Sequence, residues 1–323
     1  MTLHYTTSPH LRGKDTTSRL MGSVILALLP ALGAGIALQG LRALAVVWIS
    51  VVSAVAAEGL YRLLTRQYYT LSDGSAVLTG LLLAMTLPAT VPYWIPVVGA
   101  VFAIVVVKGL CGGLGQNIFN PALAARALLM LFWPVYLVRF APVGVKPGLL
   151  NGVDMVASAT PLHHMQMPAL PEESLLHLFL GYGPGAIGEV SALALLLGGA
   201  YLVIRKVITI RIPAAYLGTV AVLTLVFHKT DNALLWMAYQ LCTGGVMLGA
   251  IFMATDYVTS PTTRMGQVLY GVGCGVLTVV FRYTGLYPEG VTYAILIMNA
   301  AVWLLERCTA PRIFGNAKGG LIR

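Results

Sequence analysis

Charged residues are scarce in this chain of 323 residues. Asp, Glu, Lys and Arg make up 10% of the sequence and apolar residues 58%, whereas a typical soluble domain has about 25% charged residues. The mean hydropathy is +0.84. This composition excludes an ordinary soluble domain and predicts an integral membrane protein. We expect no cleavable signal peptide, because a polar opening segment leads directly into a full-length apolar span.

Cysteine is almost as scarce, and its spacing argues against a metal site. The four cysteines are Cys111, Cys242, Cys274 and Cys308, and no two lie closer than 32 positions. An iron–sulfur or zinc site built by this chain alone is therefore not expected, although a ligand shared with another protein of a complex stays open. No G-x-G-x-x-G follows a strand pattern, so a dinucleotide site is not expected either. We assign no catalytic residue and no metal site.

Long apolar segments predict ten membrane-spanning helices, because a helix that crosses the hydrocarbon core needs about 20 mostly apolar residues. The predicted spans are 21–38, 43–61, 74–90, 95–111, 117–137, 189–204, 212–228, 233–254, 265–282 and 288–306.

The net charge of +9 is distributed unevenly between the two sides of these spans. With the N-terminus in the cytoplasm, fourteen Lys and Arg fall on the cytoplasmic side and five on the outer side, and Arg126 falls inside a span. This bias is the usual signature of cytoplasmic loops. It predicts that both termini are cytoplasmic and that the long loop 138–188 is extracytoplasmic. Because membrane orientation accounts for the excess of positive charge, we expect no nucleic-acid partner.

The two halves of the chain resemble each other weakly. In the stretches that begin at Thr79 and Leu248, an apolar half-span breaks at Thr, Pro or Ser, and a Gly-rich span that ends in a basic residue follows. Five spans per half would make the two repeats inverted, an all-α architecture similar to that of urea and ammonium channels. The predicted parts are a cytoplasmic segment 1–20, a first repeat 21–137, the outer loop 138–188, a second repeat 189–306 and a cytoplasmic tail 307–323.

Polar residues near the fifth span are candidate ligand contacts. Asn117, Asn120 and Pro121 are predicted to begin a helix, since Pro is tolerated in a first turn. Such a start is either a simple cap or a contact for an anion or a flavin carbonyl. Arg126 lies inside the span, where a charge needs a partner or a function. It is either a buried structural ion pair or a contact to an anion, a flavin or an ion path.

Three acidic residues lie near span ends, Glu58 at the cytoplasmic end of the second span and Asp73 and Asp256 beside chain breaks. Interface capping explains Glu58, Asp73 and Asp256, and Asp256 is the best candidate among them for a cation ligand or a partner contact. No acidic residue is centred in a span, so we name no ion-carrying residue.

The outer loop contains the small-residue stretch DMVASATPL, residues 154–162. With SPHLRGKDTTSRLM (8–21), DGSAVLTGLLLAMTLP (73–88), GGLGQNIFNPALAARALL (112–129) and ATDYVTSP (254–261), it resembles the D subunit of the Rnf ion-translocating oxidoreductase. That family is homologous to the B subunit of the sodium-pumping NADH:quinone reductase. The resemblance runs along essentially the whole chain.

The resemblance implies that Thr160 carries FMN through a phosphoester bond. A separate flavin transferase would attach it outside the cytoplasm, where the charge distribution also places this loop. Asp154 would steer the loop or the metal of the transferase. Ser158 stands one position away from the commoner hydroxyl of the family motif, which puts a role for it in doubt. Asn120 and Arg126 are further candidate flavin contacts, and a second, noncovalent flavin such as riboflavin is a feature of the relatives.

The resemblance further implies a component of a bacterial inner-membrane complex that passes electrons between ferredoxin and NAD, coupled to Na⁺ or H⁺ translocation. The implied partners are the A and E membrane subunits, the flavoprotein G subunit and the iron–sulfur B and C subunits. Two alternatives stay open. One is a colourless channel or solute transporter of the urea or ammonium type, and the other is a structural scaffold with a vestigial loop.

Overall fold

The computed structural model describes residues 16–66, 71–142, 145–149, 165, 174–285 and 290–310. The predictions for Asp154, Ser158 and Thr160 lie outside these described residues. The regular elements are helices, as the composition predicted. They are α1 (Thr17–Gln39), α2 (Leu41–Thr65), η1 (Leu71–Asp73), α3 (Ser75–Met85), α4 (Trp94–Val101), η2 (Phe102–Gly109), α5 (Pro121–Phe132), α6 (Pro134–Leu137), α8 (Leu175–Leu180), α9 (Ala192–Ile204), α10 (Arg211–Val226), α11 (Ala233–Cys242), α12 (Val246–Leu248), η3 (Gly249–Met253), α13 (Arg264–Thr284) and α14 (Val291–Thr309).

The chain is a polytopic membrane protein. Among the described residues, α1, α2, α13 and α14 are long and apolar enough to cross a membrane, and α11 with α12–η3 forms a broken span bent by 66°. Five shorter apolar helices have 10–17 residues: α3, α4 with η2, α5, α9 and α10. These segments match the ten predicted spans in position. Several are shorter than predicted, because α3 ends before Pro88 and α5 lies between Asn120 and Pro134.

Polar side chains at the helix starts explain several boundaries. A Ser, Thr or Asn at the N-cap accepts a hydrogen bond from a backbone N–H of the first turn, which has no partner within the helix. The N-caps of this kind are Thr16, Asn120, Ser174, Ser191, Asn232 and Thr263. The predicted helix start at Asn120–Pro121 is confirmed.

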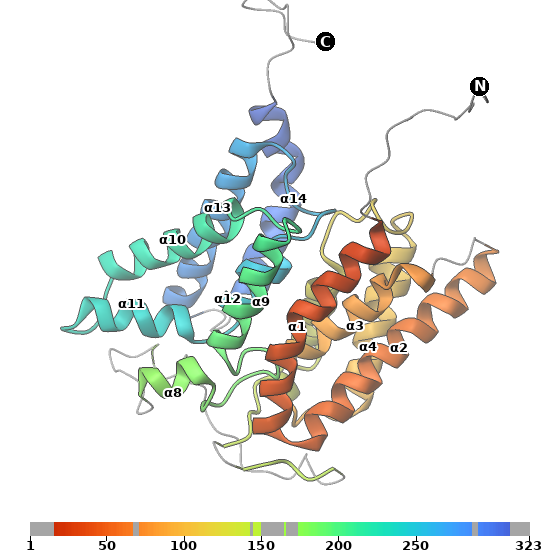
Figure 1. Ribbon diagram of the computed structural model, residues 1–323, viewed down its shortest axis with the longest axis horizontal. Coiled ribbons are helices and arrows are strands. Elements are labelled where there is room, and N and C mark those ends of the chain that lie inside the picture. The colour runs from red at the N-terminus through yellow and green to blue at the C-terminus, as the bar shows by residue number, and fades with distance from the viewer. Residues whose placement is uncertain are drawn as a thin grey trace, which may run out of the picture.

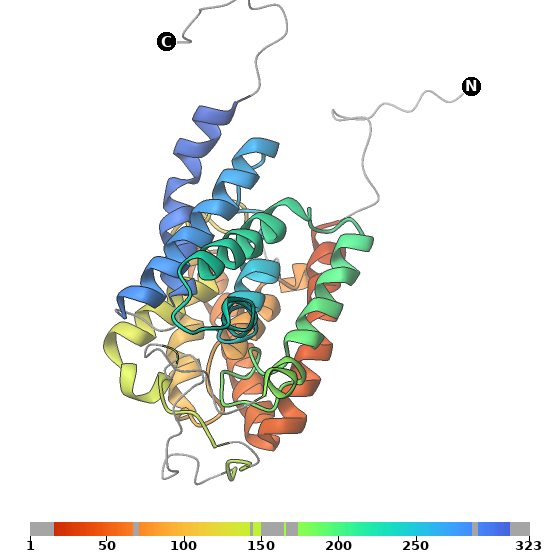
Figure 2. The same ribbon diagram turned by 90° about the vertical axis from the view of Figure 1, so that its left-hand side faces the viewer.

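Helices α1 and α9 lie side by side and join the two halves of the chain (Figures 1 and 2). Their close approach depends on glycine. A Cβ atom at Gly198 would lie 2.1 Å from the carbonyl oxygen of Ala27 on α1. One at Gly35 on α1 would lie 2.4 Å from the carbonyl oxygen of Ile187, in the segment before α9. Small residues that let helix backbones approach closely are typical of membrane helix packing.

The break after α3 is held by a buried arginine at the start of α2. The guanidinium of Arg42, 2% exposed, donates from Nε to the carbonyl of Ala89 at 2.8 Å and from Nη2 to that of Val91 at 3.0 Å. Its Nη1 donates to the carbonyl of Leu149 at 3.0 Å. The carbonyls freed by the break therefore find donors inside the protein, as irregular backbone at membrane depth requires.

A second buried arginine holds the break between α11 and α12. Arg282 donates from Nη1 to the carbonyl of Gln240 at 2.6 Å and from Nη2 to that of Thr243 at 2.9 Å. The charge count placed Arg42 and Arg282 on the outer side of the predicted spans. The structure adds that neither side chain faces solvent, because both are buried as carbonyl clamps.

Gly198→Val is expected to destabilise the protein by about 1–3 kcal/mol, because a side chain at this position meets the α1 backbone, which cannot move aside as a flexible side chain can. Thermal unfolding in detergent measures the effect. Gly218→Val is the matched control, since a Cβ at Gly218 meets nothing within 4 Å. Equal losses in both variants would contradict the close contact between α1 and α9.

Candidate functional site

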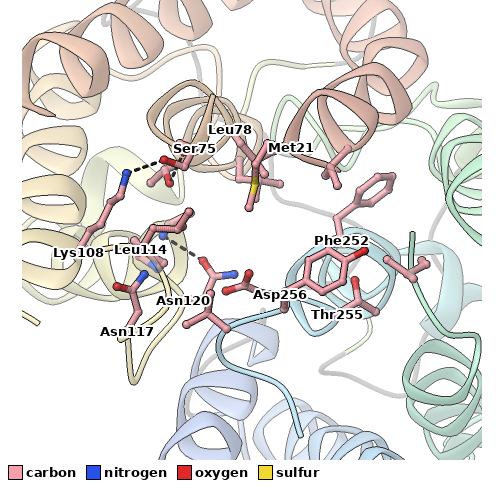
Figure 3. Close-up of a pocket in the computed structure, with 18 of the residues that line it drawn as sticks. Met21, Ser75, Leu78, Lys108, Leu114, Asn117, Asn120, Phe252, Thr255 and Asp256 are labelled. Carbon is pink, nitrogen blue, oxygen red and sulfur yellow. Dashed lines mark hydrogen bonds between the residues drawn. The ribbon is translucent and has the colours of Figure 1, made fainter. Parts of the chain in front are cut away.

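A pocket opens between the two halves of the chain, and we call it the polar pocket (Figure 3). Its walls come from α1, α3, η2, α9, the segment before α5 and the segment after η3. The polar lining residues are Ser75, Thr79, Lys108, Asn117, Asn120, Thr255, Asp256 and Tyr257, and the apolar ones include Met21, Leu78, Leu82, Leu114 and Phe252. Met21 and Ser75 lie near the starts of α1 and α3, so the pocket lies toward the end of the molecule where α1 begins and α14 ends (Figure 1).

Two asparagines from the GGLGQNIFNP segment face this pocket. Oδ1 of Asn120 caps α5 by accepting from the backbone N–H of Ala122 at 3.1 Å, and its Nδ2 donates to the carbonyl of Met253 at 3.3 Å. Asn120 therefore joins the two halves at the pocket wall. The side chain of Asn117 is 7% exposed, and its Oδ1 has no hydrogen-bond partner among the described residues. A buried amide oxygen without a partner is the kind of atom that a bound ligand satisfies.

Asp256 lies across the pocket from Lys108 and is half-buried. One of its carboxylate oxygens, Oδ2, accepts from the hydroxyl of Thr259 at 3.1 Å, and its backbone carbonyl accepts from the N–H of Ser260 at 3.1 Å. Asp256 thus belongs to the turn that follows η3, as capping predicted, and it also faces the pocket. No cluster of three or more His, Cys, Asp or Glu that could hold a metal occurs in the described part of the chain.

A buried ion network forms the wall of the pocket at α3 and η2. Nζ of Lys108, 3% exposed, donates to Oε1 of Glu58 at 2.8 Å and to Oγ of Ser75 at 2.6 Å. Arg62 donates to the same oxygen of Glu58 at 2.8 Å. The hydroxyl of Ser75 donates to Oδ1 of Asp73 at 2.6 Å. Oδ1 of Asp73 also accepts from the backbone N–H of Ser75 at 2.8 Å, as capping predicts at the start of α3. Glu58 is a buried ion-pair partner and not an interface cap.

Arg126 lies outside the polar pocket. It lines a second, smaller cavity with Thr86, Gly245 and Glu189, and its Nη1 lies 3.4 Å from Oε1 of Glu189. Both side chains are buried, with 7% and 2% of their surface exposed. The buried ion pair, one of the two interpretations of Arg126, is therefore present. Asn120 and Arg126, both predicted as flavin contacts, line different cavities.

Sequence reasoning missed Lys108 and Glu189 as site residues. Lys108 was counted among the cytoplasmic charges, and Glu189, the first residue of the predicted span 189–204, was not singled out. The sequence did contain a signal for Lys108. In each half of the chain a Gly-rich span ends in a basic residue, Lys108 in the first half and Arg282 in the second. No sequence signal paired Glu189 with Arg126, since the two are 63 residues apart.

These features define a polytopic α-helical membrane protein with broken helices and a polar pocket between its two halves. The sequence profile of the NQR2, RnfD, RnfE family matches residues 4–315. The chain belongs to this family, and the resemblance inferred from the motifs is confirmed.

Individual relatives extend over nearly the whole chain. The D subunit of the Na⁺-translocating ferredoxin:NAD⁺ oxidoreductase complex of Acetobacterium woodii is 46% identical, covering 98% of this chain and 97% of that protein. The D subunit of the proton-translocating ferredoxin:NAD⁺ oxidoreductase complex of Clostridium ljungdahlii is 40% identical, covering 96% of each. The D subunit of the ion-translocating oxidoreductase complex of an Escherichia coli strain is 34% identical, covering 99% and 100%.

Arg126→Leu is expected to lower the free energy of unfolding by about 3–5 kcal/mol, because it leaves the carboxylate of Glu189 buried without this partner. Arg126→Leu combined with Glu189→Leu removes both charges and should recover much of the loss. Denaturant unfolding of the two single variants and the double variant completes a double-mutant cycle. Additive losses would mean that the two side chains are not coupled.

Proposed function

We propose that this chain is the D subunit of an Rnf-type ion-translocating ferredoxin:NAD oxidoreductase complex, an enzyme component that is active only with its partners. The observation that carries the proposal is family membership along nearly the whole chain, with relatives of this kind at 34–46% identity. The implied partners are the A and E subunits in the membrane, the flavoprotein G subunit and the iron–sulfur B and C subunits. The relatives are named for different ions, so the proposal includes Na⁺ and H⁺.

Thr160 is the proposed attachment site of a covalent FMN. Small neighbours allow the loop to enter the active site of a flavin transferase, and Pro161 disfavours a helical conformation at Thr160. Asp154 and Ser158 are the proposed neighbours of the attachment residue. The flavin supplies the redox chemistry, while the chain supplies its position and its electrostatic surroundings. A covalent bond also keeps the flavin at a high effective concentration beside its electron partners.

Thr160→Ala is expected to abolish covalent flavin. Co-expressed with a flavin transferase, the wild-type chain should gain about 440 Da, the mass of one FMN phosphoester at a single attachment hydroxyl. Intact-mass spectrometry and in-gel flavin fluorescence measure the gain. Thr284→Ala, which removes an exposed threonine hydroxyl at the end of α13, is the matched control and should keep the added mass. No added mass on the wild-type chain, beside a modified reference acceptor, would contradict the redox assignment.

The polar pocket is the proposed site of a second, noncovalent flavin such as riboflavin. Its chemistry fits, because the unpartnered Oδ1 of Asn117 can accept from the imide N–H of an isoalloxazine. The apolar side chains of Met21, Leu78 and Phe252 offer a surface for the ring. A pocket that combines mostly apolar walls with a few convergent polar groups is typical of cofactor sites. Asn120 would fix the pocket wall, whereas Arg126 lies at the other cavity.

Asn117→Leu is expected to remove the extractable flavin and leave the covalent FMN mass unchanged, because it deletes the amide that faces the pocket. The measurement is noncovalent flavin per chain, by chromatography of a denatured extract. Asn232→Ala is the control for general destabilisation. It removes the N-cap of α11, which lies away from the pocket, and should lower the free energy of unfolding by about 1 kcal/mol. Equal flavin in Asn117→Leu and wild type would exclude this position from the flavin site.

Ten crossings in two inverted five-helix repeats are the proposed membrane architecture, with residues 21–137 and 189–306 as the repeats. The helix packing supports this arrangement, because α2 packs on α4 as α10 packs on α13, and the related pairs α1–α9 and α5–α14 are in contact. The start of α1 and the end of α14 lie at the same end of the molecule, as expected for cytoplasmic termini and an even number of crossings (Figure 1). The loop 138–188 would then be extracytoplasmic.

A channel or solute transporter of the urea or ammonium type is the rival function. It shares the broken helices, but it predicts a colourless protein that moves solute in vesicles without partners. The mass measurement on Thr160 distinguishes the two functions directly.

A further inference from the structure

A continuous line of hydrogen bonds leads from the wall of the polar pocket toward the surface. Lys108 and Ser75 line the pocket, and Nζ of Lys108 lies 2.6 Å from Oγ of Ser75. The Ser75 hydroxyl in turn lies 2.6 Å from Oδ1 of Asp73. Asp73 is half-buried, and its neighbour Ser72 is exposed. Three exchangeable groups therefore connect the pocket with the end of the molecule where α1 begins.

The position of Lys108 in this line is tightly held. Its ammonium group and the guanidinium of Arg62 converge on Oε1 of Glu58, each at 2.8 Å. Lys108 is part of η2, a π-helical segment, and such segments are frequent at functional sites. Glu58 and Ser75 accept from two of the three N–H groups of Lys108, and its side chain lines the pocket wall (Figure 3).

We propose that Lys108, Ser75 and Asp73 form a proton relay between the surface and the redox group in the polar pocket. The inference rests on the proposed flavin in that pocket. Full reduction of an isoalloxazine adds two electrons and two protons. The electrons come from the other redox carriers of the complex, whereas the protons must come from water outside a mostly apolar pocket. The relay is a described hydrogen-bonded path that joins the two.

The transfer of one proton is balanced along the relay. Lys108 gives a proton from Nζ to the reduced group and regains one from the Ser75 hydroxyl. Asp73 first takes a proton from water, which leaves hydroxide outside, and then gives this proton to the Ser75 oxygen as the Ser75 hydroxyl proton moves to Nζ. The Ser75 hydroxyl rotates between its two neighbours, as hydroxyl donors do. The charges return to their starting values, because each group ends with as many protons as it had.

The neighbouring charged groups have different roles. Glu58 holds Lys108 and Arg62, and it contacts neither Ser75 nor Asp73 in the described hydrogen bonds. Arg62 donates to Glu58 and forms no described hydrogen bond with Ser75 or Asp73. Asp256 faces the pocket from the opposite wall, where its own hydrogen bond goes to Thr259. Among these groups, Asp73 is the carboxylate that bonds to a hydroxyl in the pocket wall.

The test measures proton uptake in the assembled complex. A photogenerated low-potential donor reduces the flavins without oxygen, and a pH-indicator dye follows the protons taken up. Asp73→Asn keeps the cap on the N–H of Ser75 but cannot carry a proton, so uptake should slow by at least about tenfold. Formate, a small diffusible acid, should restore the rate. A structural defect would not respond to formate.

Variants of Ser75 provide a second measurement. Ser75→Ala interrupts the relay inside the protein, so uptake should slow without rescue by formate, whereas Ser75→Thr retains the hydroxyl and the rate. Ser72→Ala is the matched control, because this exposed hydroxyl lies beside the relay and outside its hydrogen bonds. If Ser75→Ala also loses flavin, Asp73→Asn decides, since Asp73 does not line the pocket.

Flavin content separates the two possible failures. A wild-type chain without noncovalent flavin would overturn the proposed pocket flavin, and the relay would then have no acceptor. Full flavin content with unchanged uptake in Asp73→Asn would overturn the relay alone. Slow uptake in Asp73→Asn that formate restores would establish it.

Discussion

The structure depends on satisfying backbone groups where helices break inside the membrane. A freed carbonyl in hydrocarbon costs several kcal/mol, so it must find a donor within the protein. Arg42 supplies donors to Ala89 and Val91 in the first half, and Arg282 supplies them to Gln240 and Thr243 in the second. Asn120 does the same for Met253 with a neutral amide. The breaks are therefore fixed features of the fold.

The clamped breaks make room for the site. Because η3 ends at Met253 and α5 begins only at Pro121, two irregular segments from different halves meet across the polar pocket. Each segment contributes polar side chains, Asn117 and Asn120 from one and Asp256 from the other. Two continuous helices would have packed against each other through their side chains and left no such pocket between them. The pocket therefore exists because the helices end inside the molecule.

Buried charges form separate networks with separate consequences. Glu58 neutralises the ammonium of Lys108 at the pocket wall and also pairs with Arg62 near the helix end. Glu189 pairs with Arg126 beside the second cavity, which is also lined by Thr86 and Gly245 from two of the breaks. Breaking such a pair is costly because the remaining partner stays in a low-dielectric interior. The first network therefore holds Lys108 at the wall of the polar pocket, and the second holds Arg126 at the smaller cavity.

Composition and local pattern determined the class of this protein, the positions of its apolar segments and the helix start at Asn120, because each depends on neighbouring residues and on the solvent that they prefer. The motifs also identified the family. The partners of the buried charges were decided by the tertiary structure, since Glu58 meets Lys108 from 50 residues away and Arg126 meets Glu189 from 63. The charge count recorded Arg42 and Arg282 only as charges on the outer side, without their partners, for the same reason. A positive residue at the end of an apolar segment has the same local sequence whether its side chain faces water or a broken helix. Only the packing of distant segments distinguishes these two environments.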